Sequence, residues 1–459
     1  MKLKLYHLIL PVAALAVLPS CHLYKEYEMP VENSAIMGDY KNALQDTDST
    51  TLAHLSWQEV FTDPQLQQLI QTALDANRDL ANAKLNIDIA QAQLKGAKLA
   101  YFPSVAFSPN GGAASYGGSD MSWSYTLPLA ANWEVDVFGK LLNNKRKAQV
   151  NLEQSMDYEQ AVRSQIICSV ANTYYAIAWL QQQLDLTERT CEIWKEQVTT
   201  MEDLKAAARV NEAAVVQSRA NYYNIASSIP DIKSSIAQLQ NTMSILLGSY
   251  PKEWAVGGDI EFNMPACTQS GVPLYYLAVR PDVRAAERSV AAAYYTTNIA
   301  RSNFYPSLNI SAQGGFTNAL GSMVSNPGKW FIQLGASLVA PIFSRGQNIA
   351  TLRAAEASQK QALNTFESTV LSAAADVSDA IVKINAADQK RQMILQQIDQ
   401  LEKAVEYTED LMQFGQTTTY LEILTARSAL LNAQLASLSN IHDKAAALIS
   451  LYQAVGGGY

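Results

Sequence analysis

The stretch from Trp123 to Gly139 constrains the fold of this chain more than any other. Its odd positions are mostly aromatic or aliphatic, from Trp123 through Trp133 to Val137, whereas most even positions carry Ser, Thr, Asn, Glu or Asp. A period of two is that of a β-strand, whose successive side chains point to opposite faces. Strands in soluble sheets usually have about five or six residues, so this longer alternation predicts a transmembrane strand. A long edge strand of a soluble sandwich is the alternative for this stretch alone.

Two later stretches repeat the alternation, so the sequence predicts two β-hairpins, at about 103–138 and about 306–343. Their apolar members are Leu308, Ile310, Ala312 and Phe316 in one stretch and Trp330, Ile332, Leu334, Ala336, Leu338 and Ala340 in the other. Trp123, Trp133 and Trp330 are candidates for an aromatic membrane girdle. Packing of these three side chains against a helical layer is the alternative.

The charge balance and the motifs exclude two classes of protein. The chain has 459 residues, a formal net charge of -8 and no basic stripe, whereas nucleic-acid binding requires a basic face. We therefore expect no nucleic acid as a partner. We also expect no enzyme, because the chain has no nucleotide-phosphate loop, no HExxH and no GxSxG motif, and its four histidines are scattered.

The N-terminus predicts export and a lipid anchor. Residues 1–20 have a short basic region followed by an apolar one, as in a secretory signal. The sequence Leu18-Pro19-Ser20-Cys21 resembles a bacterial lipobox, which would make Cys21 the acylated first residue of the mature chain. An ordinary cleaved signal is the alternative. Residues 21–56 then fit an extended tether without periodicity.

Three further cysteines show no metal-binding pattern. Cys168, Cys191 and Cys267 are odd in number and have no CxxC spacing, so a metal site is not expected. Cys168 and Cys191 fall within helical patterns and are predicted to be small core residues.

Very long helices follow each predicted hairpin. From Lys140 to about Ala208 the chain has no proline and no glycine, and a helix of that length extends about 100 Å. The predicted long helices are about 140–208 and 212–247, the latter interrupted by Pro230, then about 347–412 and 419–455. A compact globule cannot bury such helices, so we expect a coiled bundle or a projection from the sheet.

The order of elements is duplicated with a shift of about 200 residues. Asn77-Arg78-Asp79-Leu80 corresponds to Arg280-Pro281-Asp282-Val283, Tyr101-Phe102-Pro103-Ser104 to Phe304-Tyr305-Pro306-Ser307, and Asp136-Val137-Phe138 to Pro341-Ile342-Phe343. The sequence thus predicts a first repeat at 57–250, an equatorial connector at 251–273 and a second repeat at 274–459.

Two hairpins give only four strands per chain, which cannot close a barrel. No later window has the roughly 18 to 20 apolar residues of a membrane helix, so a membrane-crossing form of this chain must be a barrel. Unpaired strand edges are not tolerated in hydrocarbon, and closure therefore requires several chains. Three chains would give twelve strands, although the pattern itself does not specify three.

The chain resembles the bacterial outer-membrane efflux proteins of the TolC and OprM kind, in particular their lipoprotein branch. The resemblance rests on FTDPQLQQLIQTAL, the paired YFPS and FYPS, WEVDVFGKLLNNKRKA, APIFSRGQ and the ending YQAVGGGY, which occur in the family's order over nearly the whole mature chain. It implies an α+β fold in which a trimeric outer-membrane β-barrel, with four strands per chain, continues into a long periplasmic α-helical barrel.

The same resemblance implies the passive exit duct of a tripartite efflux pump. The chain would form a homotrimer. Its further partners would be a periplasmic adaptor protein, an inner-membrane transporter of the resistance-nodulation-division type and outer-membrane lipid. No cofactor is expected besides the acyl anchor. A channel for protein secretion and a lipid-tethered periplasmic coiled-coil scaffold are the alternative functions.

The resemblance also indicates where a periplasmic gate and a docking surface would lie. Leu421 matches a leucine that narrows the closed aperture, with ordinary bundle core as the alternative. The family's acidic position falls on Thr425 and its basic one on Ser428, with Arg427 displaced by one residue, so a salt-linked lock is not clearly encoded. Adaptor docking is expected at the helical tips, which contain Val210, Asn211, Glu212, Gly415, Gln416 and Thr417.

Overall fold

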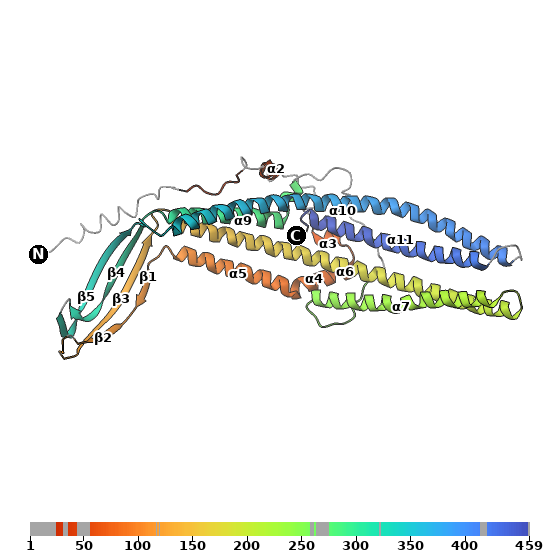
Figure 1. Ribbon diagram of the computed structural model, residues 1–459, viewed down its shortest axis with the longest axis horizontal. Helices are drawn as coiled ribbons and strands as arrows, with labels where there is room; N and C mark the ends of the chain where they lie inside the picture. The colour runs from red at the N-terminus through yellow and green to blue at the C-terminus, as the bar shows by residue number, and fades with distance from the viewer. Residues whose placement is uncertain are drawn as a thin grey trace. The chain divides into compact units, whose positions relative to one another are not determined.

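A computed structural model describes residues 24–30, 35–43, 56–115, 117–118, 120–257, 261–262, 275–320, 323–413 and 420–457 (Figure 1). The chain forms two compact units, and each unit takes segments from both sequence repeats. Unit 1 comprises residues 1–30, 85–156 and 285–367, and unit 2 comprises residues 31–84, 157–284 and 368–459.

Unit 1 contains one antiparallel sheet. Its strands are β1 (Ser104–Phe107), β2 (Asn110–Ala114), β3 (Ser122–Val135), β4 (Ser307–Leu320) and β5 (Met323–Val339). The order is β1-β3-β4-β5, and β2 also pairs with β3. The two predicted hairpins are therefore present, but the sheet has five strands rather than four because the first arm of the first hairpin is broken into β1 and β2.

Prolines explain the break in that arm. Pro109 separates β1 from β2, and the amide of Ser108 donates to the carbonyl of Pro128 at 3.2 Å. Neither proline has an N–H to give to a strand ladder. Strand β3 is also shorter than its alternating pattern. It ends at Val135, where the amide of Val137 bonds to the Val135 carbonyl at 2.9 Å, and Asp136 Oδ2 instead accepts from Leu142 N at 2.7 Å in the next helix.

The strand registers place the alternating residues on two distinct faces. Leu127 pairs with Phe316, and Phe316 pairs with Trp330, so these side chains share one face. The apolar sheet face contains the exposed side chains Phe107, Leu127, Leu129, Phe316, Trp330, Ile332, Leu334 and Leu338. The polar sheet face contains Thr126, Asn132, Glu134, Asn309, Ser311, Gln313, Gln333 and Ser337, with a Gln313–Gln333 side-chain hydrogen bond of 2.7 Å.

Shorter helices lead into the sheet and the long helices. They are α2 (Ala35–Ala43), α3 (Trp57–Val60), α4 (Pro64–Ala76), α5 (Arg78–Leu99), α8 (Tyr275–Val279) and α9 (Pro281–Ser302). Asp63 caps α4 by accepting from Gln65 N, and Pro64 begins the helix, as Asp-Pro predicts. The expectation of an extended tether over 21–56 is wrong at α2, where Met37 and Tyr40 are buried and therefore stabilise a helix.

Four long helices complete the fold. They are α6 (Lys140–Ala206), α7 (Glu212–Leu246), α10 (Gln347–Gln413) and α11 (Tyr420–Ala454). Helix α7 continues through Pro230, so the predicted interruption is wrong. A proline inside a helix costs about 3 kcal/mol or more, but Ile225 and Ile232 are buried on either side of it. Their packing fixes both halves of the helix.

The core of unit 2 lies between these helices. One cluster contains Cys191, Trp194, Ile225, Leu424 and Leu431, contributed by α6, α7 and α11. Cys168 is also buried, and burial raises the pKa of its thiol to about 12. Both cysteines are thus core residues, as predicted, whereas Cys267 lies outside the described residues. None of the described helices has the length and apolar character needed to cross a membrane.

Candidate functional site

The tip between α6 and α7 is a short, capped turn. Asn211 is the N-cap of α7, and its side chain accepts from Ala214 N at 3.1 Å. Ala208 adopts a left-handed conformation with φ of 56°, which is unfavourable for a residue with a Cβ. Lys205 forms an ion pair with Glu212 across the turn, and this hydrogen-bonded lysine lowers the pKa of Glu212. The tip is therefore held by a cap and an ion pair, and it contains Val210, Asn211 and Glu212.

The second tip connects α10 to α11. Gly415, Gln416 and Thr417 lie outside the described residues, but α11 begins immediately afterwards at Tyr420. The hydroxyl of Tyr420 lies 2.5 Å from Ser218 Oγ on α7. Ser218 Oγ also donates to the Ala214 carbonyl at 2.9 Å, so it accepts from Tyr420. This bond ties the first residue of α11 to the second turn of α7.

Burial influences the chemistry of Tyr420. Its hydroxyl has a raised pKa because burial disfavours the phenolate, although its hydrogen bonds with Ser218 and Gln197 and the charge of Arg427 act in the opposite direction. The hydroxyl therefore remains protonated and able to donate at neutral pH.

Leu421 is exposed in the isolated chain. Its side chain is 65% exposed, whereas Ile423 and Leu424 are buried, so Leu421 does not belong to the core of its own chain. Thr425 lies one turn later on the exposed side, and its hydroxyl donates to the Leu421 carbonyl at 2.8 Å. Leu421 and Thr425 thus form a small exposed patch, because residues four apart in a helix share a face.

Arg427 lies apart from that patch. Its Nε and Nη2 both donate to Glu409 Oε1 on α10, at 2.9 and 2.6 Å. Its side chain is mostly buried. The pair therefore joins α10 to α11 within one chain. The structure brings Leu421 and Thr425 together but directs Arg427 towards α10, and the pattern of the sequence did not point to Glu409.

The three candidate girdle tryptophans differ in their surroundings. Trp123, at the start of β3, and Trp330, in the middle of β5, are each 69% exposed. Trp133 is partly buried, and its Nε1 donates to the Tyr101 carbonyl at 2.9 Å. Trp123 and Trp330 thus extend the apolar sheet face. Trp133 instead fixes the segment that precedes β1, through its bond to Tyr101.

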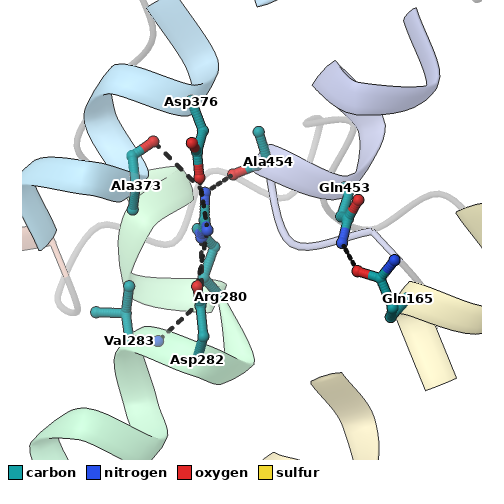
Figure 2. Close-up of polar contacts among 8 residues, drawn as sticks. All are labelled: Gln165, Arg280, Asp282, Val283, Ala373, Asp376, Gln453 and Ala454. Atoms are coloured by element: carbon teal, nitrogen blue, oxygen red, sulfur yellow. Dashed lines mark hydrogen bonds and ion pairs between the residues drawn. The ribbon is translucent and has the colours of Figure 1, made fainter. Parts of the chain in front are cut away.

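An arginine that the sequence did not single out joins three helices in unit 2 (Figure 2). Arg280 precedes α9 and donates to Asp282 through Nε and Nη2, at 3.0 and 2.7 Å. Nη2 also contacts Asp376 on α10 at 3.1 Å, and Nη1 donates to the Ala454 carbonyl at the end of α11 at 3.2 Å.

Charge pairing outweighs desolvation at this arginine. Burial would lower the pKa of Arg280, but the hydrogen bonds that it donates to Asp282 and Asp376 and the charges of these carboxylates raise it overall. Burial would raise the pKa of Asp282, but Arg280 holds it below its ordinary value. The only sequence signal for this cluster is the Arg-Pro-Asp-Val segment within the duplication, because its partners Asp376 and Ala454 lie far along the chain.

One predicted feature, the acylated cysteine, is not placed by the structure. Cys21 lies outside the described residues. Within those residues, no group of three or more His, Cys, Asp or Glu side chains is arranged to hold a metal ion.

An amphipathic sheet with two unpaired edges, joined to two long helical hairpins, defines a channel-forming subunit. The family model described as outer membrane efflux protein matches residues 69–249 and 275–457. The chain belongs to this family. It is an outer-membrane export channel of an efflux system, with a large helical periplasmic part, and the two matched segments correspond to the two sequence repeats.

Individual relatives cover almost the whole chain. The cation efflux system protein CusC of Escherichia coli K12 is 27% identical over 98% of this chain and 99% of its own length. The toluene efflux pump outer membrane protein TtgC of Pseudomonas putida is 28% identical over 96% of this chain and 94% of its own. A crystal structure of CusC superposes with a TM-score of 0.80 at 26% identity, covering 88% of this chain and 95% of that chain.

Proposed function

We propose that three copies of this chain form the exit duct of a tripartite pump, with the apolar sheet face towards lipid. The sheet carries this proposal. Eight large apolar side chains are exposed on one face while the other face is amide- and hydroxyl-rich. Water on both faces would leave this apolar surface uncovered, whereas lipid on one face and a watery lumen on the other match both.

The periplasmic gate in this proposal is the Leu421 patch. Leu421 lies in the first turn of α11 and is exposed, whereas Ile423 and Leu424 are buried, so Leu421 is free to meet the same residue of other copies at an aperture. Arg427 supports the gate indirectly, because its bonds to Glu409 hold α11 against α10. A rearrangement that opens the aperture would have to move this helical hairpin or break its Tyr420–Ser218 tie to α7.

The docking partners follow from the tips. A periplasmic adaptor would bind the α6–α7 tip at Val210, Asn211 and Glu212 and the α10–α11 tip at Gly415, Gln416 and Thr417. An inner-membrane transporter of the resistance-nodulation-division type would supply the energy, because the duct contains no nucleotide-binding motif. Acylation of Cys21 would add a second attachment to the outer membrane.

The cargo in this proposal is a small solute chosen by the transporter. The related CusC is named for cation efflux and TtgC for toluene efflux, so similar ducts serve chemically unlike solutes. Protein secretion is not favoured by either name. A periplasmic scaffold would leave the apolar sheet face in water, which argues against it.

Single-channel conductance in a planar bilayer tests the duct and its gate together. We expect a small conductance for the purified wild-type protein and a conductance several-fold larger for Leu421→Ala, because truncation widens the proposed constriction. Leu411→Ala is a matched control, since Leu411 is also exposed but lies on α10. Equal conductance of wild type and Leu421→Ala would refute the gate, and a protein that neither conducts nor forms a stable oligomer would refute the duct.

A further inference from the structure

Unit 1 contains two strand-to-helix joints that correspond to each other in the sequence repeats. Joint one, residues 136–139, connects β3 to α6, and joint two, residues 340–346, connects β5 to α10. Each joint contains a phenylalanine, Phe138 and Phe343, in the matching segments Asp136-Val137-Phe138 and Pro341-Ile342-Phe343. Left-handed residues follow both, Gly139 in joint one and Arg345 with Gly346 in joint two.

Joint one is packed within its own chain. The rings of Phe138 and Tyr305 are stacked, with centroids 5.1 Å apart and an angle of 17°. Tyr305 lies at the corner between α9 and β4. The partner strands β3 and β4 bring these two corners together, since Val135 pairs with Leu308 at the end of their ladder.

Joint two has no such cover from the described residues of its own chain. Ile342 is 98% exposed and Phe343 is 85% exposed, although burial of a phenylalanine side chain is favourable. On the other edge of the sheet, Phe102 at the corner between α5 and β1 is 69% exposed. The duplication matches Phe102 to Tyr305, because Tyr101-Phe102-Pro103-Ser104 corresponds to Phe304-Tyr305-Pro306-Ser307.

The strand order explains why one joint is covered and the other is not. In the order β1-β3-β4-β5, the pair β3 and β4 lies inside the chain, whereas β5 and β1 are the edges. Pairing β5 of one copy with β1 of the next would repeat, between chains, the β3–β4 junction that exists within the chain. It would bring Phe343 to the position relative to Phe102 that Phe138 has relative to Tyr305.

The two faces of the sheet provide an independent check. Leu338 pairs with Leu308, which pairs with Val135, and Val105 pairs with Ala131. Leu338 and Val105 therefore lie on the apolar sheet face of their respective edges. Antiparallel pairing of these edges in a register that sets apolar residues opposite each other makes the apolar face continuous, whereas a slip of one residue would reverse one strand's faces.

We infer that Phe343 of one copy packs against Phe102 of a second copy, forming an aromatic contact at each junction between chains. The inference rests on the proposed trimeric duct and adds to it a named contact and the direction of the edges that meet. The contact would cover the Ile342–Phe343 segment and give the two open edges a partner of matching sequence.

Thiol cross-linking of the purified protein tests this contact. The variant Phe343→Cys/Phe102→Cys, in a Cys267→Ser background that retains the buried Cys168 and Cys191, is treated with a short bis-maleimide and analysed by denaturing electrophoresis. We expect covalent dimers and trimers. The matched variant Phe138→Cys/Tyr305→Cys should react within one chain and remain a monomer on the gel. Phe343→Cys/Trp123→Cys should give no ladder, because Trp123 lies near the opposite end of the strands.

The oligomeric state, measured by native mass spectrometry in detergent, separates two kinds of failure. Trimers without a cross-linked ladder, while the intrachain control reacts, would overturn the Phe343–Phe102 contact and leave the duct intact. Absence of trimers in the unmodified protein would overturn the proposed duct and the contact with it. As a second measurement, Phe343→Ala should lower the trimer fraction severalfold more than Leu334→Ala, since Leu334 is exposed on the same strand but remote from the joint.

Discussion

The starts of α5 and α9, called the Asn77 joint and the Arg280 joint, occupy matching places in the two repeats and show how one backbone arrangement accepts different side chains. At the Asn77 joint, Asn77 Nδ2 donates to the Leu246 carbonyl at the end of α7 at 2.9 Å, and its Oδ1 accepts from Asp79 N at 2.8 Å. At the Arg280 joint, Arg280 Nη1 donates to the Ala454 carbonyl at the end of α11 at 3.2 Å. Each joint thus ties the end of its repeat to the beginning.

Each of these two joints also contains a glycine in the left-handed conformation. Gly248 follows α7 with φ of 61°, and Gly456 follows α11 with φ of 85°. Gly248 lies against Ala76, and Gly456 lies against Val279 and Arg280, so each glycine touches the segment that precedes its helix. The difference is in reach. The side chain of Asn77 bonds to α5 and α7, whereas the side chain of Arg280 bonds to α11 and also reaches Asp376 on α10.

The largest effect is expected for Arg280→Ala. The change leaves Asp282, Asp376 and the Ala454 carbonyl without their common donor, and removing hydrogen bonds to a charged group costs about 3 kcal/mol. We expect a clear fall in the melting temperature of the helical signal, measured by circular dichroism in detergent. The melting temperature of Arg280→Lys should lie between those of Arg280→Ala and wild type, because lysine keeps the charge but loses the bidentate fork. Equal melting of Lys and wild type would show that the fork is unimportant.

The pH dependence of that effect has a definite sign. Arg280 lowers the pKa of Asp282, so its stabilisation is complete above the unfolded pKa and is lost as pH falls through the lower folded pKa. The difference between wild type and Arg280→Ala should therefore be largest at neutral pH and shrink below the ordinary value of 3.8.

The sequence predicted the framework of these joints but not their contacts. The duplication aligned Asn77 with Arg280, and helix periodicity located α6, α7, α10 and α11, because such patterns are local and repeated over many turns. It did not identify Asp376 or Ala454 as partners of Arg280, since they are 96 and 174 residues away. Helix α2 was missed for the same reason, because Met37 and Tyr40 stabilise it by burial against distant parts of unit 2.

The candidate gate shows a similar limit. The resemblance to a family located Leu421, Thr425 and Arg427 at one tip, but only the folded chain shows that Leu421 is exposed and Arg427 is directed to Glu409. Side-chain direction depends on which neighbouring helix supplies a partner. In the strands, by contrast, alternation alone predicted both faces correctly, because a strand has a fixed period of two.

Alanine at the two glycines should separate crowding from backbone conformation. A Cβ at Gly248 would lie 2.5 Å from the Ala76 carbonyl oxygen, whereas at Gly456 its nearest neighbours are at 3.4 Å. A left-handed alanine costs about 1 kcal/mol. We therefore expect Gly456→Ala to lower the free energy of unfolding by about that amount and Gly248→Ala to lower it by about 2 kcal/mol. Thermal melting of both variants measures the difference.

Asparagine at the first glycine is the control for that comparison. Asparagine tolerates the left-handed region but carries a Cβ. If Gly248→Asn melts with Gly248→Ala, the contact with Ala76 causes the loss. If Gly248→Asn melts with wild type, backbone conformation alone is responsible and the proposed crowding is wrong.

The smallest effect is expected for Asn77→Ala. The change removes the cap of α5 and the bond to the Leu246 carbonyl, and the loss of an N-cap costs about 1 kcal/mol. Asn77→Asp keeps the acceptor for Asp79 N but loses the Nδ2 donor, so it isolates the tie between α5 and α7. We expect the melting temperature of Asn77→Asp to lie between those of Asn77→Ala and wild type. Both Asn77 variants should melt at a higher temperature than Arg280→Ala. If Asn77→Ala were as unstable as Arg280→Ala, the extra reach of the arginine to α10 would contribute nothing, and the two joints would be equivalent in energy as well as in backbone.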